Sequence, residues 1–282
     1  MGSLIFGGWH WETGVAVPII ALASIYTIGR RAWGLRSRRP VGAAWKTSAF
    51  IIGCAALATA LLSSIDAIAT DVFTAHMIQH ELLMAVAAPL LVLAEPGVAM
   101  LWAFPHRVRR SIGAVLSAHV VRRVWHWLTR PVDAFLLHAL AIWLWHIPSL
   151  FQAALTNESV HAAQHITFFG SGLLYWWSVL HPRRREAFGL SLVSLFGTAV
   201  HTAALGALLA TTHVVWYPAY GEHATAWGLT AIEDQQLAGL VMWIPAGFVY
   251  LVAALVVLRR WMRQSAWSLE NDQSSYSVES TI

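Results

Sequence analysis

Residues 76–95 read HMIQHELLMAVAAPLLVLAE, a long apolar segment that begins with two histidines four positions apart. A second segment, residues 161–180, begins in the same way with HAAQH. On a helix, residues four apart lie on one face with Cβ atoms about 5–6 Å apart, so each pair of imidazoles can bind one metal ion or flank one cofactor. Because burying a polar ring in a membrane is unfavourable, such histidines are candidates for function.

The composition around these segments indicates a membrane protein with several spans. Of the 282 residues, 57% are hydrophobic and 11% are charged, whereas soluble domains have about 25% charged residues. We therefore expect the membrane, and not nucleic acid, to account for the basic balance. The single cysteine, Cys54, excludes a disulfide framework. No basic residue precedes Arg30, so we expect no cleaved signal peptide and a first span that stays as an anchor.

The apolar runs predict an all-α bundle of seven transmembrane helices. A hydrocarbon core of about 30 Å needs about 20 apolar residues per helix. Seven runs have this length: 14–33, 44–64, 75–95, 132–151, 161–180, 188–212 and 234–258. We expect residues 1–263 to form one membrane domain and residues 264–282, which are polar and rich in Ser, to form a disordered cytoplasmic tail.

The charges between the runs predict the orientation. All 18 Lys and Arg residues lie in alternate connections, within 30–46, 107–130, 183–185 and 259–263, and the other connections carry acids but no cation. The positive-inside rule then places the N-terminus outside and the C-terminus in the cytoplasm. The basic segment 105–131 has apolar residues at helical spacing, which predicts an interfacial helix whose arginines contact anionic membrane lipid.

With this orientation, six histidines and one carboxylate are expected at the outer rim of the bundle. Two methionines, Met84 and Met242, continue the same helix faces inward. Imidazole and thioether ligands near an oxidising compartment favour copper. An alternative role for Asp234 is to cap a helix, and an alternative role for the two methionines is to fill gaps in the packing. The candidate metal ligands are His76, His80, His161, His165, His146, His213, Asp234, Met84 and Met242.

The segment from His76 to Leu93 resembles the signature of the CtaG family, the assembly factors of caa-type cytochrome c oxidase. The second H-x-x-Q-H motif and Asp234-Gln235 followed by Gly239 and Met242-Trp243 are also similar to it. The resemblance covers residues 10–262 and implies seven spans in a bacterial plasma membrane. It implies assistance to copper-centre assembly, with a haem–copper oxidase subunit as one partner and a periplasmic or extracellular copper donor as another. Glu95 departs from the family pattern.

Two other functions are compatible with the residues alone. A membrane zinc hydrolase needs three protein ligands and a general base, and Glu81 beside His80 is a candidate base, although it points about 100° away on an ideal helix. Paired histidines on facing helices also suit the axial positions of haem. A retinal protein is excluded because the only lysine, Lys46, lies at the edge of a span. The favoured hypothesis is a copper-binding protein without enzymatic activity.

Overall fold

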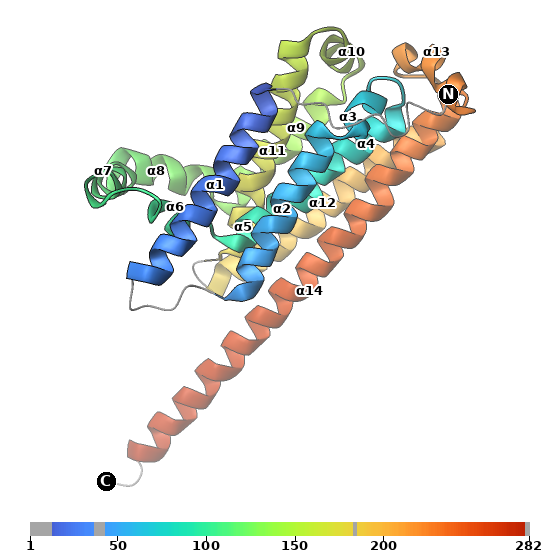
Figure 1. Cartoon of the computed structure of the whole chain (residues 1–282). Coiled ribbons are helices and arrows are strands. Elements are labelled where there is room, and N and C mark those ends of the chain that lie inside the picture. Colours follow the sequence, from blue (N-terminus) through green and yellow to red (C-terminus); the bar gives the residue numbers. More distant parts are fainter. Residues whose placement is uncertain (1–12, 37–42, 183–184, 280–282) are drawn as a thin grey trace.

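The computed structural model describes residues 13–36, 43–182 and 185–279, with side chains described up to residue 264 apart from Arg185 and Glu222. Its elements are all helical, and the described residues include no strand. The predicted all-α class is therefore confirmed. Figure 1 shows the long helices side by side in one bundle, with shorter helices at its flank and at one end. The first part of the chain forms α1 (Thr13–Arg36), α2 (Ala44–Leu62) and α3 (Ser64–Ala69).

Among the described residues, five helices are long and apolar enough to cross a membrane: Thr13–Arg36, Ala44–Leu62, Phe73–Ala94, Glu186–Thr211 and Ala231–Gln264. A sixth span results if α9 (Pro131–Trp145) and α10 (Pro148–Thr156) count as one broken span. The helix α11 (Glu158–Leu180) packs among them and is 23 residues long, but it is not among the five. The chain is thus a multi-pass membrane protein with five or six clearly apolar spans.

The span predicted over 132–151 is divided into two helices. The chain bends by 75° between α9 and α10, where His146 ends the first helix and Pro148 begins the second. Proline lacks an N–H and disfavours a helical conformation in the residue before it, so Pro148 suits the start of a new helix and not the interior of an old one. The bend places His146 at a corner facing the bundle.

The most buried helix is the one that carries His76 and His80. It consists of α4 (Phe73–Glu81), a π-helical segment η1 (Leu82–Ala87) and α5 (Ala88–Ala94), and it packs against α2, α11 and α14 (Ala231–Glu279). In the π segment the Ala88 N–H bonds to the Leu83 carbonyl, five residues back. Pro89 has no N–H to continue this pattern, and the freed carbonyl of Met84 accepts a 2.8 Å hydrogen bond from the Trp176 indole.

The helices α12 (Arg185–Thr211) and α14 pack at very close range. A Cβ atom on Gly239 would lie 2.5 Å from the Gly206 carbonyl oxygen, and one on Gly206 would lie 2.7 Å from that of Gly239. Small residues allow this approach, which drives helix association in membranes by close packing. The connection between α12 and α14 consists of η2 (Pro218–Tyr220), α13 (Gly221–Ala224) and η3 (Thr225–Trp227). Asp234 follows this connection, in the first turn of α14, and lies at the start of α4.

The basic segment forms two helices and not one, α7 (His106–Ser117) and α8 (His119–Leu128), after the short α6 (Gly97–Leu101). Neither α7 nor α8 has a buried residue, and both project from the flank of the bundle (Figure 1). At the other extreme, α14 continues to Glu279 where we expected a disordered tail from residue 264. Residues 248–279 contain no Gly or Pro, so nothing in the sequence ends a helix that is already nucleated.

Candidate functional site

A residue from α14 fixes the position of the first histidine pair. Val72 precedes α4 and offers no side-chain cap. Asp234 supplies it instead: its carboxylate accepts hydrogen bonds from the Phe73 N–H at 2.7 Å, from the Thr74 N–H at 2.9 Å and from the Thr74 hydroxyl at 2.6 Å. A carboxylate at a helix N-terminus satisfies unpaired donors and the helix dipole together. Asp234 thereby anchors the turn that presents His76 and His80.

The second pair is positioned by a local cap. The Asn157 side chain accepts hydrogen bonds from the Ser159 and Val160 N–H groups, which starts α11 one turn before His161. The adjoining turn is tied to α9 by a 2.7 Å hydrogen bond from the Trp145 indole to the Thr167 hydroxyl. Since α4 and α11 enter the bundle at the same end, the two H-x-x-Q-H turns meet.

The four imidazoles form one cluster. Within each helix the ring centroids are 4.3 Å apart for His76 and His80 and 4.2 Å apart for His161 and His165. Between the helices, His76 lies 5.6 Å from His161 and 6.4 Å from His165, and His80 lies 5.5 Å from His165. The spacing read from the sequence therefore brings all four rings together, two from each helix.

Burial leaves several of these ring nitrogens without a hydrogen bond. His76 and His80 are each 1% exposed. The Nε2 atom of His76, both ring nitrogens of His80 and the Nε2 atom of His165 are buried and have no hydrogen-bond partner among the described residues. Buried polar groups are nearly always partnered in native proteins, and each exception requires an explanation. Here the unpaired atoms are those that ligate metals.

His146 lies behind an aromatic wall next to the cluster. Its Nδ1 atom lies 2.7 Å from the Ile142 carbonyl, and its buried Nε2 atom has no hydrogen-bond partner within the described part of the chain. The rings of Phe151 and Phe168 contact His146 on one side and the cluster on the other, at 5.0 Å from His76 and 4.6 Å from His80 respectively. His146 is thus a second-layer neighbour of the four rings.

The two candidate methionines belong to the part of the core next to the histidines. Met84 and Met242 are both buried and belong to one apolar cluster with Phe168. Phe168 also contacts His80, so the thioethers continue inward from the imidazoles as the helix faces predict. Their packing fits the gap-filling role and the ligand role equally well, because polarizable thioethers do both.

Two other candidate ligands do not join the cluster: His213 because of its position, and Asp234 because of its hydrogen bonds. His213 is exposed in the connection after α12, and it makes no ring contact with the cluster among the contacts of the described residues. Asp234 already uses both carboxylate oxygens to cap α4. Gln79 turns away from the rings, since its amide donates to the Ala60 carbonyl at 2.9 Å and to Asp66 at 2.6 Å. It therefore holds α4 to α2 and α3 and does not fix a histidine tautomer.

The donor atoms are close but are not arranged around one point. In the described part of the chain, no group of three or more His, Cys, Asp or Glu side chains has a geometry that could hold a metal ion. The rings instead pack on one another, some edge to face and some tilted. The chemistry of the donor set fits copper or zinc, whereas the geometry of this state does not yet provide a coordination sphere.

Two buried tyrosines near the cluster were not predicted from the sequence. Tyr217 donates a 2.8 Å hydrogen bond to the His146 carbonyl, and Tyr220 donates one of 3.2 Å to the Ala69 carbonyl. Burial raises the pKa of both phenols, and the charge of Asp234 raises that of Tyr220 further, so both remain neutral donors. In the sequence, the run Trp216-Tyr217-Pro218 resembles an interfacial belt of aromatic residues. Only the fold shows that Tyr220 lies 6.3 Å from His76 and that Tyr217 packs on Phe151 beside the cluster.

Three mycobacterial proteins are similar in sequence to this chain over most of its length. An uncharacterized protein of Mycobacterium bovis and one of Mycobacterium tuberculosis are each 27% identical over 265 residues, which cover 91% of this chain and 40% of theirs. An uncharacterized protein of Mycobacterium leprae is 23% identical over 273 residues, with 92% and 40% covered. The chain therefore spans less than half the length of these relatives. No solved structure matches it.

One family profile covers most of the chain. The family described as cytochrome c oxidase caa3 assembly factor matches residues 24–264. The matched region includes both H-x-x-Q-H turns, the π segment and the capping aspartate. This protein belongs to the cytochrome c oxidase caa3 assembly factor (CtaG) family.

Proposed function

We propose that this protein holds copper as cargo at the histidine end of the bundle, the end where α4 and α11 begin, and assists the maturation of a copper centre in a haem–copper cytochrome c oxidase. The observation that carries the proposal is the cluster of His76, His80, His161 and His165, with buried ring nitrogens of His76, His80 and His165 unpaired. Family membership points to oxidase assembly and to a non-enzymatic role.

The donor set suits a metal that must be released again. Imidazole serves both oxidation states of copper and thioether favours Cu(I), whereas thiolate binds more firmly. No cysteine is present near the cluster, since the only one, Cys54, lies on α2. Rotation of the side chains about χ1 and χ2 is the movement needed to turn packed rings into a coordination sphere. Met84 and Met242, which share one apolar cluster with Phe168 next to the imidazoles, are the further ligands that we assign to Cu(I).

The setting we propose is a plasma membrane with α11 and the α9–α10 pair completing seven spans. The basic connections then face the cytoplasm, the N-terminus lies outside, and the histidine end faces the periplasmic or extracellular side. A copper donor and an oxidase subunit reach the cluster from that side. His213 is exposed on the adjoining connection and lies outside the cluster.

The proposal is tested by metal analysis of the full chain purified in detergent. Copper close to one or two per chain, or uptake of Cu(I) in competition with a chromophoric chelator, is the expected result. His76→Ala combined with His80→Ala should abolish this binding, and His213→Ala is the matched control that should retain it. Zinc in place of copper would overturn the assignment in favour of a hydrolase, and a Soret band in favour of haem. Unchanged copper in the double variant would remove the site.

The role in assembly needs a separate test in cells. A strain lacking the gene should show less active oxidase at limiting copper while the oxidase polypeptides are still made. The double histidine variant should fail to restore activity, and the His213→Ala variant should restore it. Normal oxidase activity in the deletion strain at limiting copper would contradict the proposal even if the purified protein binds copper.

A further inference from the structure

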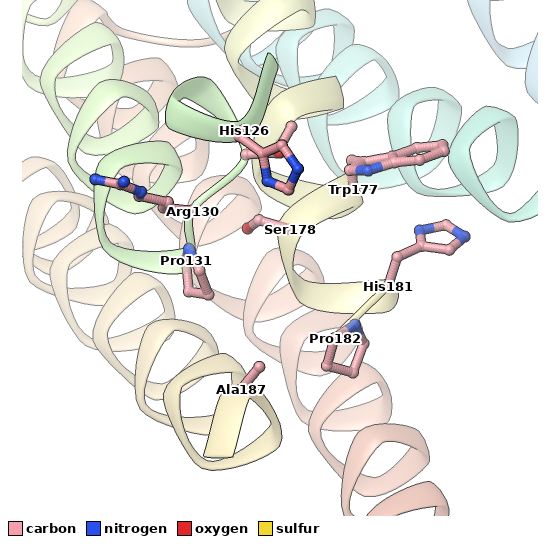
Figure 2. Close-up of a pocket in the computed structure, with 9 residues that line it drawn as sticks. His126, Arg130, Pro131, Trp177, Ser178, His181, Pro182 and Ala187 are labelled. Carbon is pink, nitrogen blue, oxygen red and sulfur yellow. The ribbon is translucent and has the colours of Figure 1, made fainter. Parts of the chain in front are cut away.

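A polar pocket lies at the end of the bundle opposite the histidines, where α11 ends and α9 and α12 begin. Its volume is about 130 Å³, and it is lined by residues of α8, α11 and the connections on either side of α9 and α12. Figure 2 shows the His126 imidazole directed from α8 into the space above Ser178 and Pro131, and the Arg130 side chain extending away from Ser178. The lining thus includes an imidazole and a hydroxyl, which donates to the Tyr175 carbonyl at 2.7 Å, and Arg130 contributes positive charge beside them.

An apolar groove adjoins this pocket. It has a volume of about 480 Å³, within the range of ligand-binding pockets, and it runs between α1, α2, α5 and α11 with α6 and α8 beside it. Its walls include Leu22, Phe50 and Leu174, and Gly170 faces open space where any side chain would project. Trp177 lines both the groove and the polar pocket, so this side chain lies between the two cavities.

A pair of tryptophans marks the junction at the level of the membrane interface. Trp125 of α8 lines the groove and meets Trp177 of α11 edge to face, with ring centroids 5.5 Å apart. Tryptophan favours the boundary between headgroups and hydrocarbon because its ring is apolar and its N–H is polar. The exposed apolar side chains of α8, Val120, Val124 and Trp127, need the same environment.

The charge around the pocket is positive. Arg122, His126 and Arg130 follow one another at intervals of four, so the first two share one face of α8 and the third continues the row beyond its end. None of the described residues that line the pocket or the groove is acidic. Glu95, which contacts the pocket residue His181 at 2.9 Å, is also paired with Lys46 at 2.6 Å. The described residues that line the two cavities therefore present no negative charge to an anionic group.

We propose that the pocket and the groove together bind one phospholipid with an anionic headgroup. The phosphate lies at His126 with Arg122 and Arg130 at the rim, and one acyl chain fills the groove past Trp177 and Gly170. Basic pockets between transmembrane helices on the cytoplasmic side are suited to anionic headgroups. The lipid holds α8 against the bundle, because α8 has no buried residue of its own to do so.

The test measures lipid retention by native mass spectrometry. The full chain is released from nanodiscs that contain equal amounts of phosphatidylglycerol and phosphatidylcholine. The wild type should retain phosphatidylglycerol preferentially. Arg122→Gln with Arg130→Gln should lower that preference by about fivefold per arginine. Gly170→Leu, which fills the groove, should remove both lipids. Arg107→Gln with Arg110→Gln, the same charge change on α7, is the control that should behave as the wild type does.

Several results would overturn the proposal. Equal retention of the two lipids by the wild type would remove headgroup recognition. Full retention by Gly170→Leu in a protein that unfolds at the wild-type temperature would place the acyl chain outside the groove. Displacement of phosphatidylglycerol by inorganic phosphate would indicate a site for free phosphate. A co-purified polypeptide that cross-links at position 125 in the absence of bound lipid would indicate a partner helix in the groove.

Discussion

Glu95 and His80 lie at opposite ends of the bundle and differ in whether their polar atoms have hydrogen-bond partners. At one end, Glu95 uses both carboxylate oxygens, with Lys46 at 2.6 Å and His181 at 2.9 Å. At the other end, neither ring nitrogen of the fully buried His80 has a hydrogen-bond partner among the described residues. Partnered groups add to the stability of a fold, whereas unpaired buried ones subtract about 1–3 kcal/mol each. The unpaired nitrogens of His80 therefore do not add to stability, which supports the metal-binding role that we propose for them.

Asp234 sharpens this contrast because it lies at the histidine end but is fully partnered. Like Glu95, it has partners for both carboxylate oxygens, and like His80, it lies at the histidine end of the bundle. Substitutions at the three positions should therefore separate structural residues from binding residues. Thermal unfolding of the metal-free protein and of the protein with Cu(I) gives the two measurements required.

The largest effect is expected for Asp234→Ala. The substitution leaves the N–H groups of Phe73 and Thr74 buried without an acceptor, which should destabilise the metal-free protein by about 2–4 kcal/mol. The neighbouring acid Glu233 is exposed and caps its own helix through Thr230. Glu233→Ala is the matched control and should produce a clearly smaller fall in the unfolding temperature. Equal falls would mean that Asp234 does not hold α4 in solution.

The helices were largely predictable from the sequence, but their irregularities were not. Hydropathy depends on composition within one segment, so the runs around 14–33, 44–64 and 188–212 coincide with helices. The π segment depends on Pro89 just after it, which cannot donate, and on the distant Trp176, whose indole donates to the Met84 carbonyl. The 75° bend at His146 follows from Pro148, whose effect depends on whether a helix continues past it.

The candidate site was predictable only as far as local spacing determines it. The interval of four places His76 with His80 and His161 with His165, and the common depth of α4 and α11 brings the pairs together. Asp234 was placed at the correct end, but the sequence suggested that it caps its own helix or binds metal. Its actual partners lie 160 and 161 positions away, and no periodicity indicates such a pairing.

A change of intermediate size and opposite sign is expected for His80→Leu. In the metal-free protein the substitution removes two buried nitrogens without partners, so the free energy of unfolding should rise by about 1 kcal/mol. Addition of Cu(I) should raise the unfolding temperature of the wild type, because a ligand that binds only the folded state stabilises it. The variant should show no such rise. A less stable metal-free variant would show that the His80 nitrogens have partners in solution.

The smallest effect is expected for Glu95→Gln, and it should depend on pH. Glu95 is 45% exposed, so its two ion pairs contribute less than about 1 kcal/mol. Burial raises the pKa of its carboxyl, but Lys46 and His181 outweigh this and hold the pKa below its usual value.

A lowered pKa in the folded state gives stability that is present above the unfolded pKa of about 4.3 and is lost as the pH falls through the folded value. The wild type should therefore be slightly more stable than the variant at neutral pH, with the difference vanishing in acid and shrinking at high salt. A difference that persists in acid would assign the effect of Glu95 to its left-handed backbone position, φ 45°, and not to its charge.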